Sequence, residues 1–99
     1  MAIEFQYPPQ DLEQRIIEHE AGVQGSCAAM LARLAMKLRH LREDHMIEGP
    51  STRLLIYAGR LIAQGISPRR ACEFALVQAL TDEPPLQDGI RAVIESVVE

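Results

Sequence analysis

The sequence predicts an all-α protein: a small bundle of about five helices with short loops, preceded by a short N-terminal strand remnant. Three observations predict this class. Apolar residues recur at helical spacing through most of the chain, and Gly, Pro and short polar residues separate these stretches. In addition, 47% of the 99 residues are apolar, which is enough for one modest core. We therefore expect residues 1–99 to form a single helical domain.

Residues 3–7 are the exception to the helical pattern. They alternate apolar and polar side chains and stop at Pro8-Pro9, which is typical of a short strand. A single strand cannot satisfy its own backbone hydrogen bonds, so this stretch indicates a sheet that lies elsewhere. We assign residues 1–7 to a strand or linker and residues 8–99 to the helical bundle.

The first helix is predicted over residues 9–21. Pro9 suits a first helical turn, where its missing N–H has no partner to lose, and Asp11 and Glu13 suit the positive end of the helix dipole. The apolar residues expected to share its buried face are Leu12, Ile16 and Ile17.

The second helix, which Ser26 is placed to cap, has the clearest periodicity in the chain. Its apolar positions step by four and three, at Cys27, Leu31, Leu34, Leu38 and Leu41. Its opposite side carries the basic residues Arg33, Lys37, Arg39, His40 and Arg42. We predict that this side is a solvated face, with a binding patch as the alternative.

Caps and prolines mark the remaining three helices. The third is predicted over 51–64, with Ser51 as its cap and Gly65 at its end. The fourth begins at Ser67-Pro68 and stops near Leu80, and the last covers 85–98. Their expected buried residues are, in chain order, Leu54, Leu55, Ala58, Leu61 and Ile62; Ala71, Phe74, Ala75 and Gln78; and Leu86, Ile90, Val93, Ile94 and Val97.

Charge and hydropathy exclude several classes of protein. The net charge of −4 disfavours strong nonspecific binding to nucleic acid, which needs clustered cations. No stretch approaches the roughly 20 apolar residues of a membrane-spanning helix, and the N-terminus lacks the pattern of a secretory signal. We expect a cytoplasmic protein with neither nucleic acid nor a membrane as its partner.

The sequence contains no legible catalytic or metal constellation. Cys27 and Cys72 are far apart and have no neighbouring ligands at metal-binding spacing, so we expect reduced thiols. The histidines, His19, His40 and His45, match no ligand pattern, and no glycine-rich phosphate loop is present. We therefore expect no metal and no bound cofactor in this chain alone, and no catalysis by it in isolation.

The stretch "GPSTR" places a cation where a helix begins. Arg53 lies in the first turn of the third helix, although the positive end of the helix dipole favours acidic residues there. Free backbone N–H groups at such a position, capped by Ser51 and joined by a guanidinium, make a ready anion site. The local alternative, which local chemistry favours, is that Arg53 extends into solvent or pairs with Glu48.

Arg69 and Arg70 repeat this placement in the first turn of the fourth helix. They are either an exposed pair near Glu73 or a contact for a partner or an anion. The surrounding stretch "LIAQGISPRRACEFAL" also resembles a DNA-reading helix-turn-helix, although its second helix is apolar where that motif reads bases. A freestanding helical protein-interaction domain is the other alternative.

Three stretches carry a resemblance to a known family: "YPPQDLEQRIIEHEAGV", "EGPSTRLLIYAGRLIAQGISPRRACEFALVQALTDEP" and the last helix. Together they resemble the C-terminal helical region of the CbbQ/NirQ/NorQ group of MoxR-class AAA+ ATPases, over residues 3–98. The resemblance implies a helical lid that follows an ATPase core, with residues 3–7 leaving the core sheet. It also implies that Arg53 is the second-sensor arginine, which reaches the phosphates of ATP.

The resemblance further implies the surroundings of such a lid. The parent protein would bind ATP with magnesium in an AAA+ core that is absent from this chain, and would form a homo-oligomeric ring. It would work with a von Willebrand A-domain protein to remodel a metalloenzyme, either rubisco or nitric oxide reductase. The resemblance itself assigns a role to Arg53 alone. We add Ser51 as a candidate for the phosphate contact, and Arg69, Arg70 and the basic side of the second helix as candidates for contacts with a neighbouring subunit.

Overall fold

The computed structural model describes residues 7–45 and 49–98, without the side chains of 41–45, and this part of the chain consists of helices joined by short loops. The helices are α1 (Gln10–Ala21), α2 (Gly25–His45), α3 (Thr52–Ala63), α4 (Pro68–Cys72), α5 (Gln78–Leu80) and α6 (Pro84–Val97). A π-helical turn, Glu73–Val77, joins α4 to α5 without a break, so the two form one rod. The predicted all-α class with five helical segments is confirmed. The strand predicted at 3–7 lies outside the described residues except for Tyr7, which has no regular structure.

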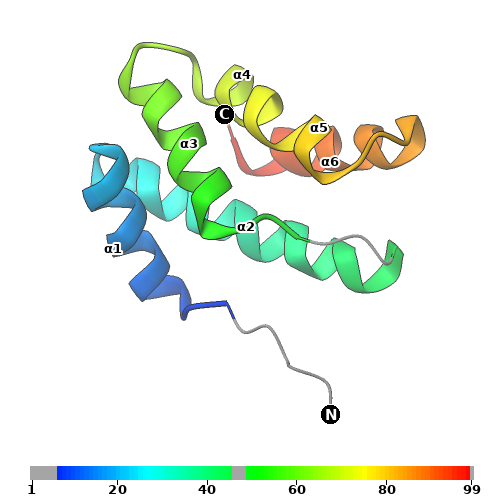
Figure 1. Ribbon diagram of the computed structural model, residues 1–99, viewed down its shortest axis with the longest axis horizontal. Helices are drawn as coiled ribbons and strands as arrows, with labels where there is room; N and C mark the ends of the chain where they lie inside the picture. The colour runs from blue at the N-terminus through cyan, green and yellow to red at the C-terminus, as the bar shows by residue number, and fades with distance from the viewer. Residues whose placement is uncertain (1–6, 46–48, 99) are drawn as a thin grey trace.

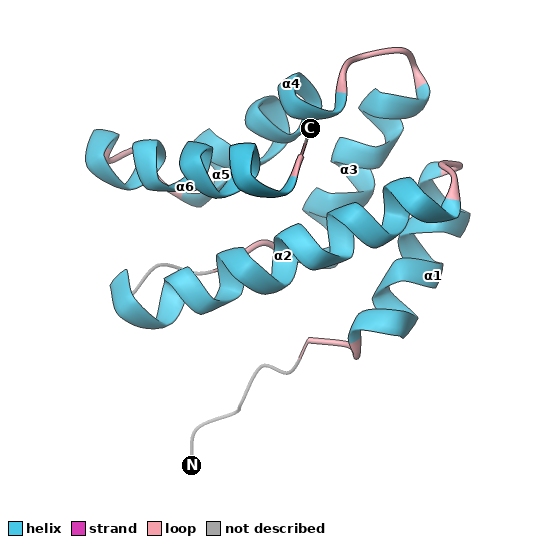
Figure 2. Cartoon of the chain, turned by 180° about the vertical axis from the view of Figure 1, so that it is seen from behind, coloured by secondary structure: helices cyan, strands magenta, loops and turns pink. Residues whose placement is uncertain are grey.

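The long helix α2 supports both halves of the bundle (Figure 1). On one side α1 packs against α2 and α3, and on the other α6 packs against α2 and the π-helical turn. Figure 2 shows α6 beside the rod of α4 and α5, with α2 running along them. Because α3 contacts α1, α2 and α4, it connects the two halves.

The core follows the predicted apolar positions of α2 and α6. Leu31, Leu34 and Leu38 are at most 2% exposed, which confirms the predicted seam, while Cys27 is only half-buried and the side chain of Leu41 lies outside the description. On α6, the predicted core residues Ile90, Ile94 and Val97 are buried, and Leu86 and Val93 are half-buried. The buried residues of α2 and α6 belong to one continuous cluster that also takes in buried side chains of α1 and α3, and Cys27 and Val93 pack against it.

Helix α3 approaches α1 so closely that the contact requires a glycine. A Cβ atom placed on Gly59 would lie 2.7 Å from the Cβ of Ala21, which is closer than two carbon atoms can pack. Leu55 and Ala58 on the same side of α3 are fully buried, as predicted, and the helix ends just before Gly65. The backbone of α3 is therefore held firmly against α1 and α2.

Two residues of the fourth helix were wrongly predicted to be buried. Phe74 and Gln78 were expected in the core, yet both are exposed, Phe74 by 71%. The buried side instead carries Cys72 and Leu76, which leaves Phe74 on the opposite side of the rod. The wider π-helical turn also rotates Val77 inward, so that Gln78 faces out.

Smaller corrections concern the starts of three helices. Leu12 is 45% exposed rather than buried, because the buried line of α1 consists of Glu13, Ile17 and Ala21. Ser26 does not cap α2, since the helix already includes Gly25 and the backbone carbonyl of residue 24 accepts the bond from Ala28 N–H. Ser67 stands at the start of α4 as predicted, but its side chain makes no capping hydrogen bond.

Candidate functional site at the start of α3

Helix α3 begins with a formed serine cap. Ser51 has extended backbone angles, and its Oγ accepts a hydrogen bond from the N–H of Leu54 at 3.4 Å. The carbonyl of Ser51 also accepts from the N–H groups of Leu54 and Leu55, at 3.1 and 3.3 Å. The cap predicted from the sequence is confirmed, and it leaves the first N–H groups of the helix directed toward its open end.

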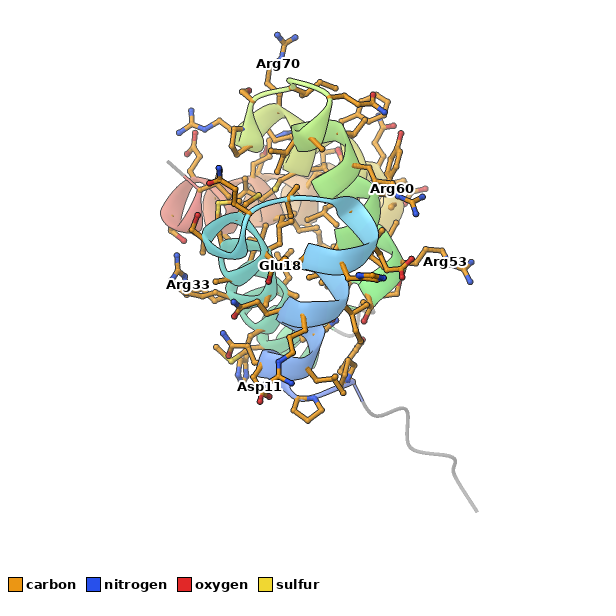
Figure 3. All side chains as sticks on the ribbon, turned by 90° about the vertical axis from the view of Figure 1, so that its left-hand side faces the viewer. Asp11, Glu18, Arg33, Arg53, Arg60 and Arg70 are labelled. Atoms are coloured by element: carbon orange, nitrogen blue, oxygen red, sulfur yellow. The ribbon has the colours of Figure 1, made fainter. Side chains whose placement is uncertain are left out.

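Arg53 is the second residue of this helix and is exposed. Figure 3 shows its side chain extending away from the ribbon. The first turn of α3 contains no acidic residue, and Arg53 makes no ion pair with the described side chains, which are those of residues 7–40 and 49–98. The alternative pairing with Glu48 falls on a residue outside the description. Arg53 thus adds positive charge to an end of the helix that is already electropositive, which favours an approaching anion.

The loop that leads into α3 is held by an ion pair that the sequence did not reveal. Arg39 of α2 donates from Nη1 and Nη2 to the two carboxylate oxygens of Glu13 of α1, at 2.8 and 2.6 Å. The same guanidinium donates from Nε and Nη2 to the carbonyl oxygen of Pro50, at 3.1 and 2.9 Å. Thr52 completes the arrangement by donating from Oγ1 to Glu13 at 2.8 Å. We call Glu13, Arg39, Pro50 and Thr52 the Glu13–Arg39 cluster.

The Glu13–Arg39 cluster is shielded from water. The side chains of Arg39 and Glu13 are only 13% and 2% exposed. The Cζ atom of Arg39 lies 3.7 Å from the centroid of the Tyr7 ring, so the ring covers one face of the guanidinium. A Cβ atom on Gly49 would lie 2.6 Å from Cγ of Arg39, so the loop passes as close to α2 as glycine permits.

The prediction of a solvated basic face on α2 was therefore wrong for Arg39. Arg33, Lys37 and His40 are exposed, as predicted. The side chain of Arg39 contacts α1 instead of solvent, because the buried carboxylate of Glu13 can bind its planar guanidinium through two hydrogen bonds. A signal was present in the sequence, since Glu13 lies four residues before Ile17 and shares its helix face. The helix dipole also favours a glutamate in this first turn, so the sequence offers a simpler explanation of Glu13.

Arg69 and Arg70 lie away from Arg53, at the start of α4. Arg69 is 3.8 Å from the carboxylate of Glu95 on α6, an exposed pair that replaces the expected proximity to Glu73. Figure 3 shows Arg70 and Arg53 pointing in different directions. Arg70 borders an open groove of about 690 Å³ that is also lined by Tyr57, Leu61, Gly65, Ile66, Ser67 and Phe74. The structure therefore groups Ser51 with Arg53, and keeps the α4 arginines separate.

The two cysteines are free thiols, as predicted. Burial raises the pKa of Cys72 to about 12, with smaller contributions from Cys27 and Glu73, and burial also raises the pKa of Cys27. Both thiols therefore remain protonated at neutral pH and are poor nucleophiles. They pack as apolar side chains and lie outside the site at the start of α3.

Together these features define an all-helical domain that presents an exposed arginine on a capped and anchored helix start. Among the described residues, no group of three His, Cys, Asp or Glu side chains could hold a metal ion. None of the helices in the described ranges is both long enough and apolar enough to cross a lipid bilayer.

Comparison with known proteins identifies the family. Residues 13–97 match the family described as CbbQ/NirQ/NorQ C-terminal, and the chain belongs to this family. Protein CbbQ of Hydrogenophilus thermoluteolus is 44% identical over 96 residues, which are 97% of this chain and 36% of the relative. The denitrification regulatory protein NirQ of Stutzerimonas stutzeri is 42% identical over 94 residues, 95% of this chain and 34% of the relative.

The third branch of the family is represented by protein NorQ of Paracoccus denitrificans, which is 35% identical over 97 residues, 98% of this chain and 36% of the relative. The resemblance inferred from the sequence is thereby confirmed. The chain spans about a third of the length of these curated relatives.

Proposed function

We propose that this chain is the helical lid that follows the ATPase core of a MoxR-class AAA+ protein, and that Arg53 contacts the phosphates of ATP bound at that core. Membership of the CbbQ/NirQ/NorQ C-terminal family supports the lid assignment. The observation that carries the role of Arg53 is its exposed side chain at the capped start of α3. An arginine at that place is suited to an anion that arrives from outside the domain.

The residues present fit one side of a nucleotide site. Arg53 offers bidentate donors, and the hydroxyl of Ser51 can still donate a hydrogen bond because its oxygen serves as the acceptor in the cap. Magnesium would be held by the ATPase core, since the described residues contain no cluster suited to a metal. Bound ATP supplies the reactive phosphate, while this chain supplies charge and position.

Arg53 acts by stabilising negative charge that develops on the phosphates. A well-placed donor of this kind contributes on the order of 3 kcal/mol to the transition state. The same contact gives the lid a preference for one nucleotide state over another, and only such a preference can move the lid when the nucleotide changes. Hydrolysis would then release the lid from the core.

Membership of the family supports a proposal for the larger assembly. The proposed parent is a cytoplasmic homo-oligomeric ring that acts with a von Willebrand A-domain partner on a metalloenzyme, either rubisco or nitric oxide reductase. Arg69 and Arg70 are proposed as contacts to a neighbouring subunit, because both side chains are exposed at the start of α4. Arg70 is the stronger candidate, since Arg69 already has Glu95 nearby.

Substitution of Arg53 in a full-length protein that joins this domain to its ATPase core tests the proposal. Arg53→Ala should lower ATP turnover about a hundredfold, which corresponds to about 3 kcal/mol, and Arg53→Lys should restore only part of it because a lysine cannot bind phosphate in a bidentate manner. Arg91→Ala is the matched control, since Arg91 is also an exposed helical arginine but pairs with Asp88 on α6. Equal turnover for Arg53→Ala and Arg91→Ala would remove the role of Arg53.

A further inference from the structure

The guanidinium of Arg39 contacts three separate segments of the chain. It binds the carboxylate of Glu13 on α1 through two donors, and the carbonyl of Pro50 in the loop before α3 through two bonds. The ring of Tyr7, in the segment that precedes α1, lies against its face. A single side chain therefore joins α1, the start of α3 and the N-terminal segment.

The bonds to the loop fix the residues immediately before Arg53. Pro50 is bound by Arg39 through its carbonyl, and Thr52 is bound by Glu13 through its hydroxyl at 2.8 Å. Ser51, which lies between them, is the cap of α3. The direction in which α3 begins, and hence the place of Arg53, depends on the Glu13–Arg39 cluster although the guanidinium of Arg53 itself stays exposed.

The contact with Tyr7 connects Arg39 to the first described residue of the chain. The ring lies 3.7 Å from Cζ of Arg39, well within the distance at which a cation and an aromatic face attract each other. Tyr7 itself is only half-buried and lies in the segment before α1. Any displacement of Tyr7 changes the surroundings of the side chain that holds Pro50.

We propose that Arg39 is a positioning residue that couples the N-terminal segment at Tyr7 to the start of α3, and so sets the placement of Arg53. This inference rests on the proposed function of Arg53 as a phosphate contact. In a lid that follows a core, the segment before α1 is the direct covalent connection to that core. Arg39 then relates the orientation of this connection to the one arginine that the lid offers to the nucleotide.

A purely stabilising ion pair would be a weaker explanation of this geometry. Replacing a buried pair with apolar residues often leaves stability unchanged, so such a pair is poorly explained by stability alone. The pair instead fixes the orientation of the Arg39 guanidinium. A planar group with hydrogen bonds on two edges and an aromatic ring against its face has one permitted orientation.

Amide hydrogen exchange in this chain tests the coupling without any nucleotide. Tyr7→Leu should speed exchange at Leu54 and Leu55, the amides that bond to Ser51, about fivefold, which corresponds to loss of a contact of about 1 kcal/mol. Arg39→Lys should speed it by about tenfold or more because the bidentate geometry is lost. Exchange at Gln87, whose amide bonds to Glu83 at the start of α6 and opens by local fraying, should not change in Tyr7→Leu.

Tyr57→Leu is the matched control for the exchange experiment. Tyr57 is an exposed tyrosine on α3 itself, and its ring faces Phe74 at 6.4 Å between centroids rather than Arg39. It should leave Leu54 and Leu55 unaltered. Unchanged exchange at these two amides in Tyr7→Leu, or an equal change at Gln87, would overturn the coupling.

ATP turnover of the full-length protein tests the positioning role. Arg39→Lys should lower turnover when Arg53 is present and should cause no further loss in the Arg53→Ala background, because it acts only through Arg53. An equal loss in both backgrounds would overturn the inference. Failure of the proposed function is seen separately, as unchanged turnover in Arg53→Ala, and does not affect the exchange result.

Discussion

Removing Arg39 alone should be far more damaging than removing both partners of its ion pair. In Arg39→Met, the carboxylate of Glu13 stays in a site where its side chain is 2% exposed, and loses both arginine donors. Among the described residues, only the Thr52 hydroxyl, at 2.8 Å, remains bound to it. Breaking a buried pair in this way costs about 3 to 5 kcal/mol, because an uncompensated charge is left behind.

The double variant Glu13→Met/Arg39→Met removes that charge and fills a similar volume with apolar atoms. It should therefore recover most of the loss and lie within about 1 to 2 kcal/mol of the unaltered chain. Some deficit should remain, because the carbonyl of Pro50 and the hydroxyl of Thr52 both lose partners.

Urea unfolding followed by circular dichroism measures both variants. A domain of this size has a total stability of about 5 to 15 kcal/mol, so the single variant should show a large fall in its unfolding midpoint. Two results would refute the reasoning: a loss below about 1 kcal/mol in Arg39→Met, or a double variant that is less stable than the single one. The first would mean that Glu13 finds other partners, and the second that the pair contributes chiefly through attraction.

Four further predictions concern the rest of the molecule. Leu34→Ala, at a fully buried position of α2, should lower the free energy of unfolding by about 2 to 5 kcal/mol, measured by urea unfolding. A loss below about 0.5 kcal/mol would contradict the placement of Leu34 in the core. Gly59→Ala should cost about 1 to 3 kcal/mol, since its new methyl group meets Ala21, and a neutral effect would show that α1 and α3 can separate freely. Because burial, then Cys27 and Glu73, raise the pKa of Cys72 to about 12, only the unfolded chain loses this proton between about pH 9 and that value. Stability should therefore fall as pH rises, by roughly 1 kcal/mol between about pH 8 and pH 10, and Cys72→Ala should show a smaller fall, whereas an identical pH dependence would contradict the shift. Titration with duplex DNA at several salt concentrations should show no salt-dependent binding, and such binding would favour the helix-turn-helix alternative.

The positions of the helices could be predicted from the sequence because their signals are local. Apolar spacing along α2 located Leu31, Leu34 and Leu38, and the pair Ser51 and Gly65 marked the limits of α3. Pattern alone failed where the backbone departs from the α-helix. The π-helical turn at Glu73–Val77 packs against α3 and α6, and no residue type in the sequence predicts it.

The site was only partly predictable, for a related reason. The placement of Arg53 could be read from its own helix, since it depends on a cap and a dipole within one turn. The Glu13–Arg39 cluster depends on three segments that are distant in sequence, and each of its side chains has an ordinary local explanation. A glutamate suits a first helical turn and an arginine suits an exposed face, so only the assembled fold shows that the two belong together.

The most direct test of the phosphate role is the ATP turnover of Arg53→Ala in the full-length protein, measured beside Arg91→Ala. We expect turnover to fall about a hundredfold for Arg53→Ala and to stay near that of the unaltered protein for Arg91→Ala. If Arg53→Ala hydrolyses ATP as fast as the unaltered protein, the exposed arginine at the start of α3 is not the contact between lid and nucleotide.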